Sequence, residues 1–199
     1  MARYGMVIDL ARCNGCGTCA MACKIARGTP RGVAWSEVRR SEVGEYPHVD
    51  LQFVPRHCMH CREAPCVSVC PSGALQKRPD GIVTLDSDTC IGCRSCQEAC
   101  PYDAPRFVEA VVGYYSESGP VSPTRHRVGA MEKCDFCRER VEAGGEPECV
   151  AACTGFARTF GDLDDPASEV SRLIAARRGH PLRPELGTGP SVFYLPKRG

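Results

Sequence analysis

The sequence has few large aliphatic side chains for its length. Leu, Ile, Val and Phe make up about one fifth of the 199 residues, a proportion at which many chains do not fold. The net charge is only +1, so charge repulsion does not explain this composition as that of a disordered chain. We therefore expect a folded protein whose core is built around something other than hydrocarbon.

Long apolar runs and a surplus of charge are also missing. The longest apolar stretch, 107–115, is interrupted by Glu109 and Gly113, so no transmembrane segment is predicted. The 25 basic and 24 acidic residues predict no nucleic-acid partner. The first ten residues contain no twin arginine and no signal-like segment, so export would depend on another subunit.

Catalytic motifs are equally scarce. The sequence shows no arrangement of Ser, His and Asp typical of hydrolases and no glycine loop that would bind phosphate. We expect no catalytic residues and no substrate-binding pocket in this chain.

Cysteine, by contrast, is abundant, with 16 residues in four groups of four. The first and third groups share the spacing C-x2-C-x2-C-x3-C, which in bacterial ferredoxins binds a 4Fe-4S cluster. The second and fourth groups have wider middle gaps. Sixteen thiolates therefore predict four 4Fe-4S clusters with four ligands each.

The assignment of cysteines to clusters follows from a rule of two-cluster ferredoxins, in which the fourth cysteine of each run binds the neighbouring cluster. Groups two and three lie closest in sequence, and their fourth cysteines, Cys70 and Cys100, are both followed by proline. These two groups are predicted to pair, and groups one and four pair by exclusion. The predicted ligands are Cys13, Cys16, Cys19 and Cys153 for cluster A; Cys134, Cys137, Cys149 and Cys23 for cluster B; Cys58, Cys61, Cys66 and Cys100 for cluster C; and Cys90, Cys93, Cys96 and Cys70 for cluster D.

An internal repeat supports this pairing. Groups one and three share C-x-G-C-x2-C-x2-A-C, and groups two and four share C-x2-C-R-E followed by proline and C-V-x2-C. Gly15 and Gly92 would let the first and third loops close around a cluster. The predicted fold class is α+β, with duplicated ferredoxin-like modules, one formed by residues 1–45 and 131–199 and the other by 46–106, and with 107–130 as an inserted loop.

Short regular elements are expected around these modules. Strands are predicted at 5–10, 49–54, 81–85, 157–160 and 191–195, longer helices at 134–143 and 168–177, single helical turns at clustered cysteines such as 96–100, and a loop at 114–129.

The cysteines have two other conceivable uses. Disulfides would suit a small secreted scaffold, but they do not require ferredoxin spacing. A zinc-binding scaffold is a stronger alternative, because C-x2-C pairs also occur in zinc sites, although the two three-interval runs do not. His57 and His60 flank Cys58, but sixteen thiolates suffice, so we expect hydrogen bonding or exposure rather than ligation.

Basic and aromatic residues near the cysteines are less specific indicators. Arg62, Arg94 and Lys133 could raise a cluster's reduction potential or simply lie in solvent. The single Trp35 is expected to pack rather than to transfer electrons.

Several further segments resemble one family. They resemble parts of the four-cluster electron-transfer subunit of dimethyl sulfoxide reductase-type molybdopterin oxidoreductases. The segments are residues 6–9 and 134–138, Gly161-Asp162-Leu163, and the closing segments 168–171, 184–188 and 192–195. The similarity is greatest to the polysulfide or thiosulfate reductase iron-sulfur subunit and covers nearly the whole chain. Two departures stand out: Thr154, not proline, follows Cys153, and 107–131 is longer than in the polysulfide type.

This resemblance implies a relay subunit. It would pass single electrons between a large catalytic subunit that carries a molybdenum or tungsten pterin cofactor and a quinone-linked membrane anchor, or another redox partner. It also implies a peripheral position on the cytoplasmic membrane, on the extracytoplasmic face after co-export with the catalytic subunit, with a cytoplasmic position as the alternative. A polyferredoxin-type subunit of a hydrogenase or formate dehydrogenase complex is the alternative function.

Overall fold

Short helices and strands make up the structure, a computed structural model that describes residues 2–112 and 125–197. The strands are β1 (Tyr4–Asp9), β2 (Glu37–Glu45), β3 (His48–Arg56), β4 (Leu75–Lys77), β5 (Val83–Leu85), β6 (Arg106–Phe107), β7 (Met131–Glu132), β8 (Arg158–Asp162), β9 (His180–Pro181) and β10 (Val192–Leu195). The helices are α1 (Thr18–Arg27), α2 (Pro65–Ser68), α3 (Ser95–Glu98), α4 (Arg138–Glu142), α5 (Glu148–Ala151), α6 (Glu169–Arg177) and the 3-10 turn η1 (Pro184–Leu186). This mixture confirms the predicted α+β class.

The largest sheet joins the two ends of the chain. Its strand order is β8-β1-β10-β9, with β1 parallel to β10 and antiparallel to β8. Alternate residues of β1 face opposite sides, as the strand period of two requires. Met6 and Ile8 face the cysteine-rich core, whereas Val7 packs with Val170 of α6. The sheet therefore separates α6 from the cysteines.

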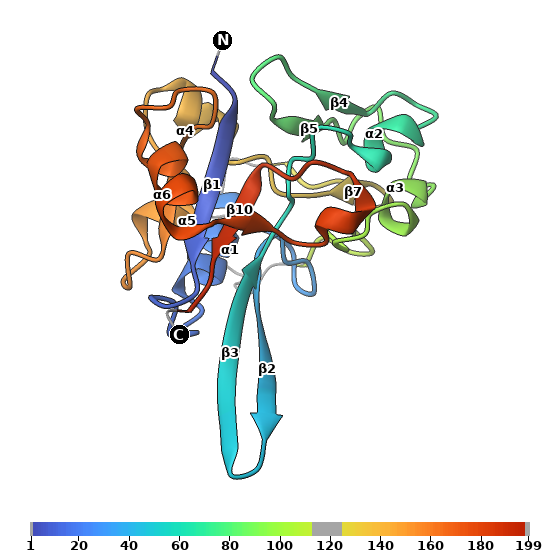
Figure 1. Ribbon diagram of the computed structural model, residues 1–199. Helices are drawn as coiled ribbons and strands as arrows, with labels where there is room; N and C mark the ends of the chain where they lie inside the picture. Colours follow the sequence, from blue (N-terminus) through green and yellow to red (C-terminus); the bar gives the residue numbers. More distant parts are fainter. Residues whose placement is uncertain (1, 113–124, 198–199) are drawn as a thin grey trace.

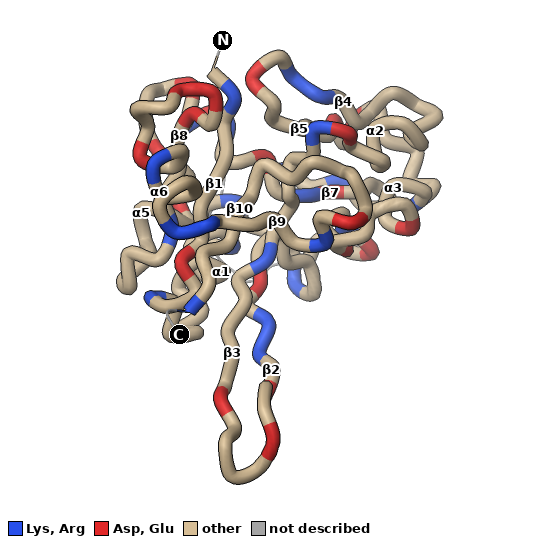
Figure 2. The backbone as a smooth tube through the Cα atoms, viewed as in Figure 1, with Lys and Arg blue, Asp and Glu red and all other residues tan. Residues whose placement is uncertain are grey.

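The remaining strands form three two-stranded ladders. Figure 1 shows β4, β5, β7, α2 and α3 on one side of the body and β1, β10 and α4–α6 on the other, while the β2–β3 hairpin projects away from both. Most side chains of this hairpin beyond its base are exposed. Acidic and basic residues are interspersed over the body in Figure 2.

The predicted insertion at 107–130 begins and ends at one ladder. Arg106 pairs with Glu132 and Phe107 with Met131 in the antiparallel β6–β7 pair, so the intervening chain leaves and returns at the same place. Residues 113–124 lie outside the described residues. The boundaries of the insertion stay a prediction.

Two helix predictions were wrong in length. The first cysteine group continues into the ten-residue helix α1, where only a single turn was expected. Its Cys19, Cys23 and Arg27 are spaced four apart and share one buried face. Conversely, the helix predicted from residue 134 begins only at Arg138, because the two preceding residues have φ angles of 56° and 52° and turn the chain in the left-handed region.

The strand predictions were better. All five predicted strands are present within a few residues of the expected ends. The partner strand β2 was not predicted, because its sequence of charged residues lacks a regular apolar alternation.

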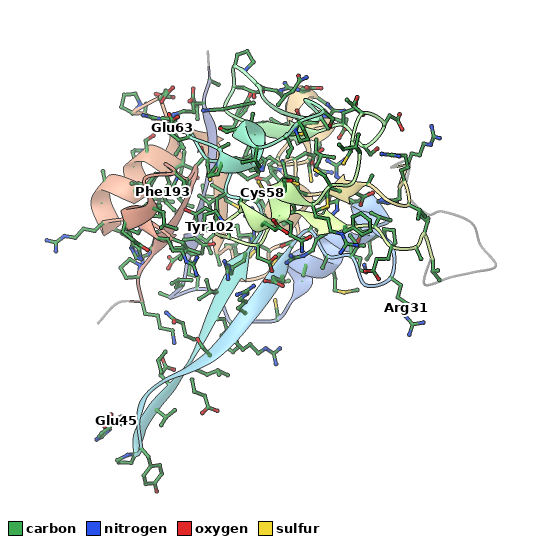
Figure 3. All side chains as sticks on the ribbon, turned by 90° about the vertical axis from the view of Figure 1, so that its right-hand side faces the viewer. Arg31, Glu45, Cys58, Glu63, Tyr102 and Phe193 are labelled. Carbon is green, nitrogen blue, oxygen red and sulfur yellow. The ribbon has the colours of Figure 1, made fainter. Side chains whose placement is uncertain are left out.

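The core contains cysteine sulfur in place of much of the missing aliphatic side chain. Its buried members, besides apolar residues, include cysteines from all four groups, and none of the sixteen cysteines forms a disulfide. Figure 3 shows Cys58 and Tyr102 inside the body and Glu45 near the end of the hairpin.

Candidate metal centre

The first site lies where the amino-terminal cysteine loop meets the end of group four. Four cysteines line a small cavity beneath the loop that precedes α1. They are Cys13, Cys16, Cys19 and Cys153. The structure therefore brings together the four residues assigned to cluster A. The Thr154 hydroxyl lies 3.8 Å from the Cys16 sulfur, so the residue that stands where the resemblance leads us to expect proline faces this site.

A second small cavity has the same construction in the other half of the chain. Its cysteines are Cys70, Cys90, Cys93 and Cys96, the set assigned to cluster D. Leu75 and Leu85 complete its apolar wall. In each cavity three cysteines of one loop meet the fourth cysteine of another group, as the ferredoxin rule describes.

The set assigned to cluster B is almost fully buried. Burial first, and then the neighbouring Cys149 and Cys137, raise the pKa of Cys23 to about 12. Burial likewise raises the pKa of Cys134 well above its ordinary value, with added contributions from Cys23 and Cys149. Cys23 of α1 thus lies among the cysteines of group four.

The set assigned to cluster C is gathered in the same way. Burial raises the pKa of Cys66 to about 12, with Cys58, Cys100 and Cys61 as neighbours that favour the neutral thiol. Cys61 has a pKa of about 12 for the same reasons, burial first and then Cys58, with Cys100 also contributing. Cys100 of group three therefore lies among the cysteines of group two.

Contacts between the sets define their order. A single side chain, Arg158, reaches Cys19 of set A and Cys149 of set B. Cys58 of set C is close enough to Cys134 of set B to raise the pKa of Cys134. Sets C and D are linked because Cys70 and Cys100 each lie in the site of the other's group. The order of the sites is therefore A, B, C, D.

An aromatic pair holds the two middle sites together. The ring of His60, in the loop of group two, stacks on Phe136, in the loop of group four, with 3.8 Å between the ring centroids. Both side chains are fully buried. The two loops therefore pack directly against each other at the junction of sets B and C.

Backbone amides point at the cysteine sulfurs in several loops. Such N–H···S hydrogen bonds stabilise negative charge on a thiolate and on the cluster it binds. The amides donate from Ala157 to Cys153 (3.3 Å), Ala104 to Cys100 (3.5 Å), Gly92 to Cys90 (3.4 Å), Met131 to Cys90 (3.4 Å) and Phe136 to Cys134 (3.5 Å).

Glycine permits two of these loops to close. Gly15 and Gly92 have φ angles of 74° and 72°, in the left-handed region that glycine adopts without strain. A Cβ atom on Gly15 would collide with the ring of Phe53, and one on Gly92 would collide with the carbonyl oxygen of Gly129. The sequence prediction that glycine is needed at these positions is confirmed.

Buried nitrogen atoms without a protein partner test the fit of a cluster. His57 and His60 are fully buried, so the prediction that they could be exposed was wrong. Burial lowers the pKa of His57 to about 3, and it also lowers that of His60, so both rings are neutral. His60 Nδ1 accepts a hydrogen bond from the amide of Val83, which leaves a proton on Nε2. The Nε2 atoms of both rings have no hydrogen-bond partner in the protein. His57 Nδ1 donates to the carbonyl oxygen of Cys58, so the Nε2 of this neutral ring carries no proton, and of the two rings only His60 offers an N–H donor that suits cluster sulfide.

The basic residues singled out from the sequence differ in their environments. Lys133 is buried, and its ammonium donates hydrogen bonds to the carbonyl oxygens of Val83 and Cys134. The Arg94 guanidinium lies 3.7 Å from the centroid of the Phe107 ring, and Arg62 is exposed. Lys133 alone of these three is buried beside the cysteines.

Trp35 packs in the core, as predicted, and donates a hydrogen bond to Glu132. Sequence analysis missed Arg158. The one signal in the sequence is its position. Arg158 follows the last cysteine of group four by five residues, and the equivalent position after group two holds Leu75.

Comparison with known proteins gives consistent matches. Two models of a 4Fe-4S dicluster domain match the chain, one over residues 12–74 and the other over 49–114 and 120–163. The chain is 41% identical to the iron-sulfur subunit of an arsenate respiratory reductase from Shewanella sp. (strain ANA-3), over 97% of this chain and 96% of that protein. It is 42% identical to the iron-sulfur subunit of a dimethyl sulfoxide reductase assigned in Halobacterium salinarum, over 98% of this chain and 79% of that one. It is also 41% identical to a subunit of the tetrathionate reductase of Salmonella typhimurium, over 97% and 72% respectively.

The helices in the described part of the chain are short. None of them has the length and apolar character needed to cross a bilayer.

Proposed function

Because this chain belongs to the family of 4Fe-4S dicluster proteins that includes the iron-sulfur subunits of arsenate, dimethyl sulfoxide and tetrathionate reductases, we propose that it relays single electrons through four 4Fe-4S clusters. A cluster of this kind accepts and returns one electron at a potential that its protein surroundings set. The chain supplies the thiolates, the amide donors and the burial.

The observation that carries this function is the order of the four cysteine sets. Sets A and D lie at the two ends of the row, and each includes one exposed cysteine, Cys16 and Cys93 respectively. The middle sets consist mainly of buried cysteines, among them Cys134, Cys149 and Cys58. A row with accessible ends and a buried middle suits electron entry at one end and exit at the other.

The ligand assignments follow from this row. In our proposal each cluster takes three cysteines from one group and the fourth from its partner group, as given above for clusters A to D. The two end cavities and the neighbours of Cys23 and Cys66 support these sets. The ferredoxin-like modules would then be 1–45 with 131–199, which holds A and B, and 46–106, which holds C and D, with 107–130 as an insertion.

The partner in this proposal is a large catalytic subunit that carries molybdenum or tungsten on a pterin cofactor. The relatives are named as subunits of reductases, two of them as iron-sulfur subunits, which supports a multi-subunit complex. A membrane anchor at the other end of the relay, and a peripheral position on the extracytoplasmic face of the cytoplasmic membrane, are the finer parts of the proposal.

Anaerobic purification of the native complex tests the function. We expect about sixteen irons per copy of this chain in addition to those of any partner, since each of four clusters holds four, together with molybdenum or tungsten in a large co-purifying subunit. Electrons supplied by dithionite should bleach the cluster absorbance, and the substrate oxidant should restore it only when the large subunit is present.

Three results would contradict the proposal in different ways. Zinc without iron would replace the relay by a zinc-binding scaffold. Iron with nickel in the partner would assign the chain to a hydrogenase complex, and iron with no large partner would make it a free polyferredoxin.

A further inference from the structure

One buried guanidinium bridges two of the cysteine sets. Arg158 begins strand β8 and is only 5% exposed. Its Nη2 donates to the sulfur of Cys19 at 3.4 Å, and its Nη1 donates to the sulfur of Cys149 at 3.5 Å. Nη1 also lies 3.4 Å from the sulfur of Met6. Cys19 belongs to set A and Cys149 to set B.

The cysteine sulfurs are the counter-charge of this cation. Among the residues that the structure describes, no carboxylate pairs with Arg158. A buried cation without an anion is costly, so the thiolates of both sets stabilise it, and it stabilises them in return.

The first half of the chain lacks this feature at the matching position. The sequence after Cys70 aligns with that after Cys153, so that Ala74 matches Ala157 and Leu75 matches Arg158. Both residues begin a strand, β4 or β8, and both line the cavity of the nearby end site. Leucine can donate no hydrogen bond to sulfur. The duplication therefore provides an internal comparison of the same place with and without the cation.

We propose that Arg158 is a positioning residue that raises the reduction potentials of clusters A and B together by donating to one ligand of each. This inference rests on the proposed function. Reduction adds one negative charge to a cluster, and a buried cation bonded to its thiolate ligand stabilises the added charge. Because one guanidinium contacts a ligand of each cluster, removing it should lower both potentials.

Two substitutions at this position test the proposal in the full chain, purified anaerobically with its partner. Arg158→Leu introduces the residue of the first half, and Arg158→Lys keeps the charge but loses the planar fork that reaches both sulfurs. Arg172→Leu is the matched control, because it removes the same charge from an exposed position on α6, across the sheet from the cysteines. The iron content of every variant is measured before its potentials.

Potentiometric titration followed by EPR then measures the four potentials. For Arg158→Leu we expect the potentials of two clusters to fall by at least about 59 mV, which for one electron is a tenfold change in the reduction equilibrium constant. The potentials of the other two clusters should stay unchanged. Arg158→Lys should give a smaller fall at the same two clusters, and Arg172→Leu should shift none.

The outcomes separate this inference from the function on which it rests. Wild-type complex without iron overturns the proposed function itself. Full iron content with four unchanged potentials in Arg158→Leu, or with an equal shift of all four, overturns the role of Arg158 alone. If the leucine variant loses clusters, the lysine variant decides: a fall at two clusters supports the proposal, and unchanged potentials overturn it.

Discussion

The exchange of the fourth cysteine between groups one and four makes a sharp prediction for paired substitutions. Cys13 and Cys153 line the same cavity, whereas Cys23 lies among the cysteines of group four. The double variant Cys13→Ala with Cys153→Ala should therefore damage one cluster. The double variant Cys13→Ala with Cys23→Ala should damage two, although both of its cysteines come from one sequence group.

The magnitude follows from counting ligands. Removing Cys13 and Cys153 leaves set A with two thiolates, too few to hold a four-iron cluster, and leaves sets B, C and D complete. About three intact four-iron clusters should remain per chain. Removing Cys13 and Cys23 leaves three thiolates in set A and three in set B, so that about two intact clusters remain.

Quantitative EPR of the dithionite-reduced protein measures this difference, because it counts reduced four-iron clusters and excludes three-iron species formed at damaged sites. Iron analysis of the same samples is the control for general loss of metal. The reverse pattern, with two clusters lost from the Cys13 and Cys153 pair and one from the Cys13 and Cys23 pair, would mean that each group binds its own cluster. The ligand sets for A and B would then be wrong.

Three further predictions concern the scaffold. Gly15→Ala should destabilise the protein by more than Gly17→Ala. Both residues have a positive φ, which strains alanine by about 1–2 kcal/mol, but only at Gly15 would the added Cβ also collide with an aromatic ring. Anaerobic thermal unfolding compares the two variants, and equal losses of stability would contradict the steric argument. Although burial opposes its charge, the hydrogen bond to Glu132 raises the pKa of His126 above 6.5. This pair should therefore stabilise the fold fully below about pH 6.5 and lose its contribution as pH rises through the folded-state pKa of His126. The variant His126→Gln should remove that pH dependence from the free energy of unfolding measured from about pH 6 to 9, and an unchanged dependence would show that other groups cause it. Replacing residues 42–51 by an Asn-Gly turn should leave the iron content unchanged, because these residues pair with one another along the hairpin, and the contacts that Asp50 and Leu51 make outside it are with Lys197, not with a cysteine site. Loss of iron would show that the hairpin supports the cluster sites.

Cysteine spacing predicted more of the site than any other feature of the sequence. Each short loop restricts where its three sulfurs can lie, and the fourth cysteine follows from an established exchange rule. The structure gathers the four cysteines assigned to each end site around one cavity. Strand positions were also predicted well, because the short continuous apolar runs of β1 and β10 reflect a sheet covered on both faces, by the cysteine-rich core on one side and by α6 on the other.

The features that sequence did not predict depend on tertiary contacts. Nothing local distinguishes Arg158, at the start of a strand, from the exposed arginines elsewhere in the chain. The same holds for the burial of Lys133 and of His57. Helix α1 was underestimated because ferredoxin spacing suggests only a short turn after the third cysteine, whereas here the helix continues to Arg27, whose side chain forms ion pairs with Asp135 and Glu139.

The two halves of the chain share their cysteine loops but differ at the junctions between sites. A guanidinium connects the ligands of A and B, whereas the junction of B and C is formed by the stack of His60 on Phe136, two side chains without net charge. Four identical clusters in identical surroundings would have identical potentials, and neither end would be favoured by the electron. Because the thiolate sets are alike, differences in potential along the row must come from what surrounds them. The buried cation at one junction, and leucine at the matching place in the other half, give the protein a means of making clusters A and B easier to reduce than they would otherwise be.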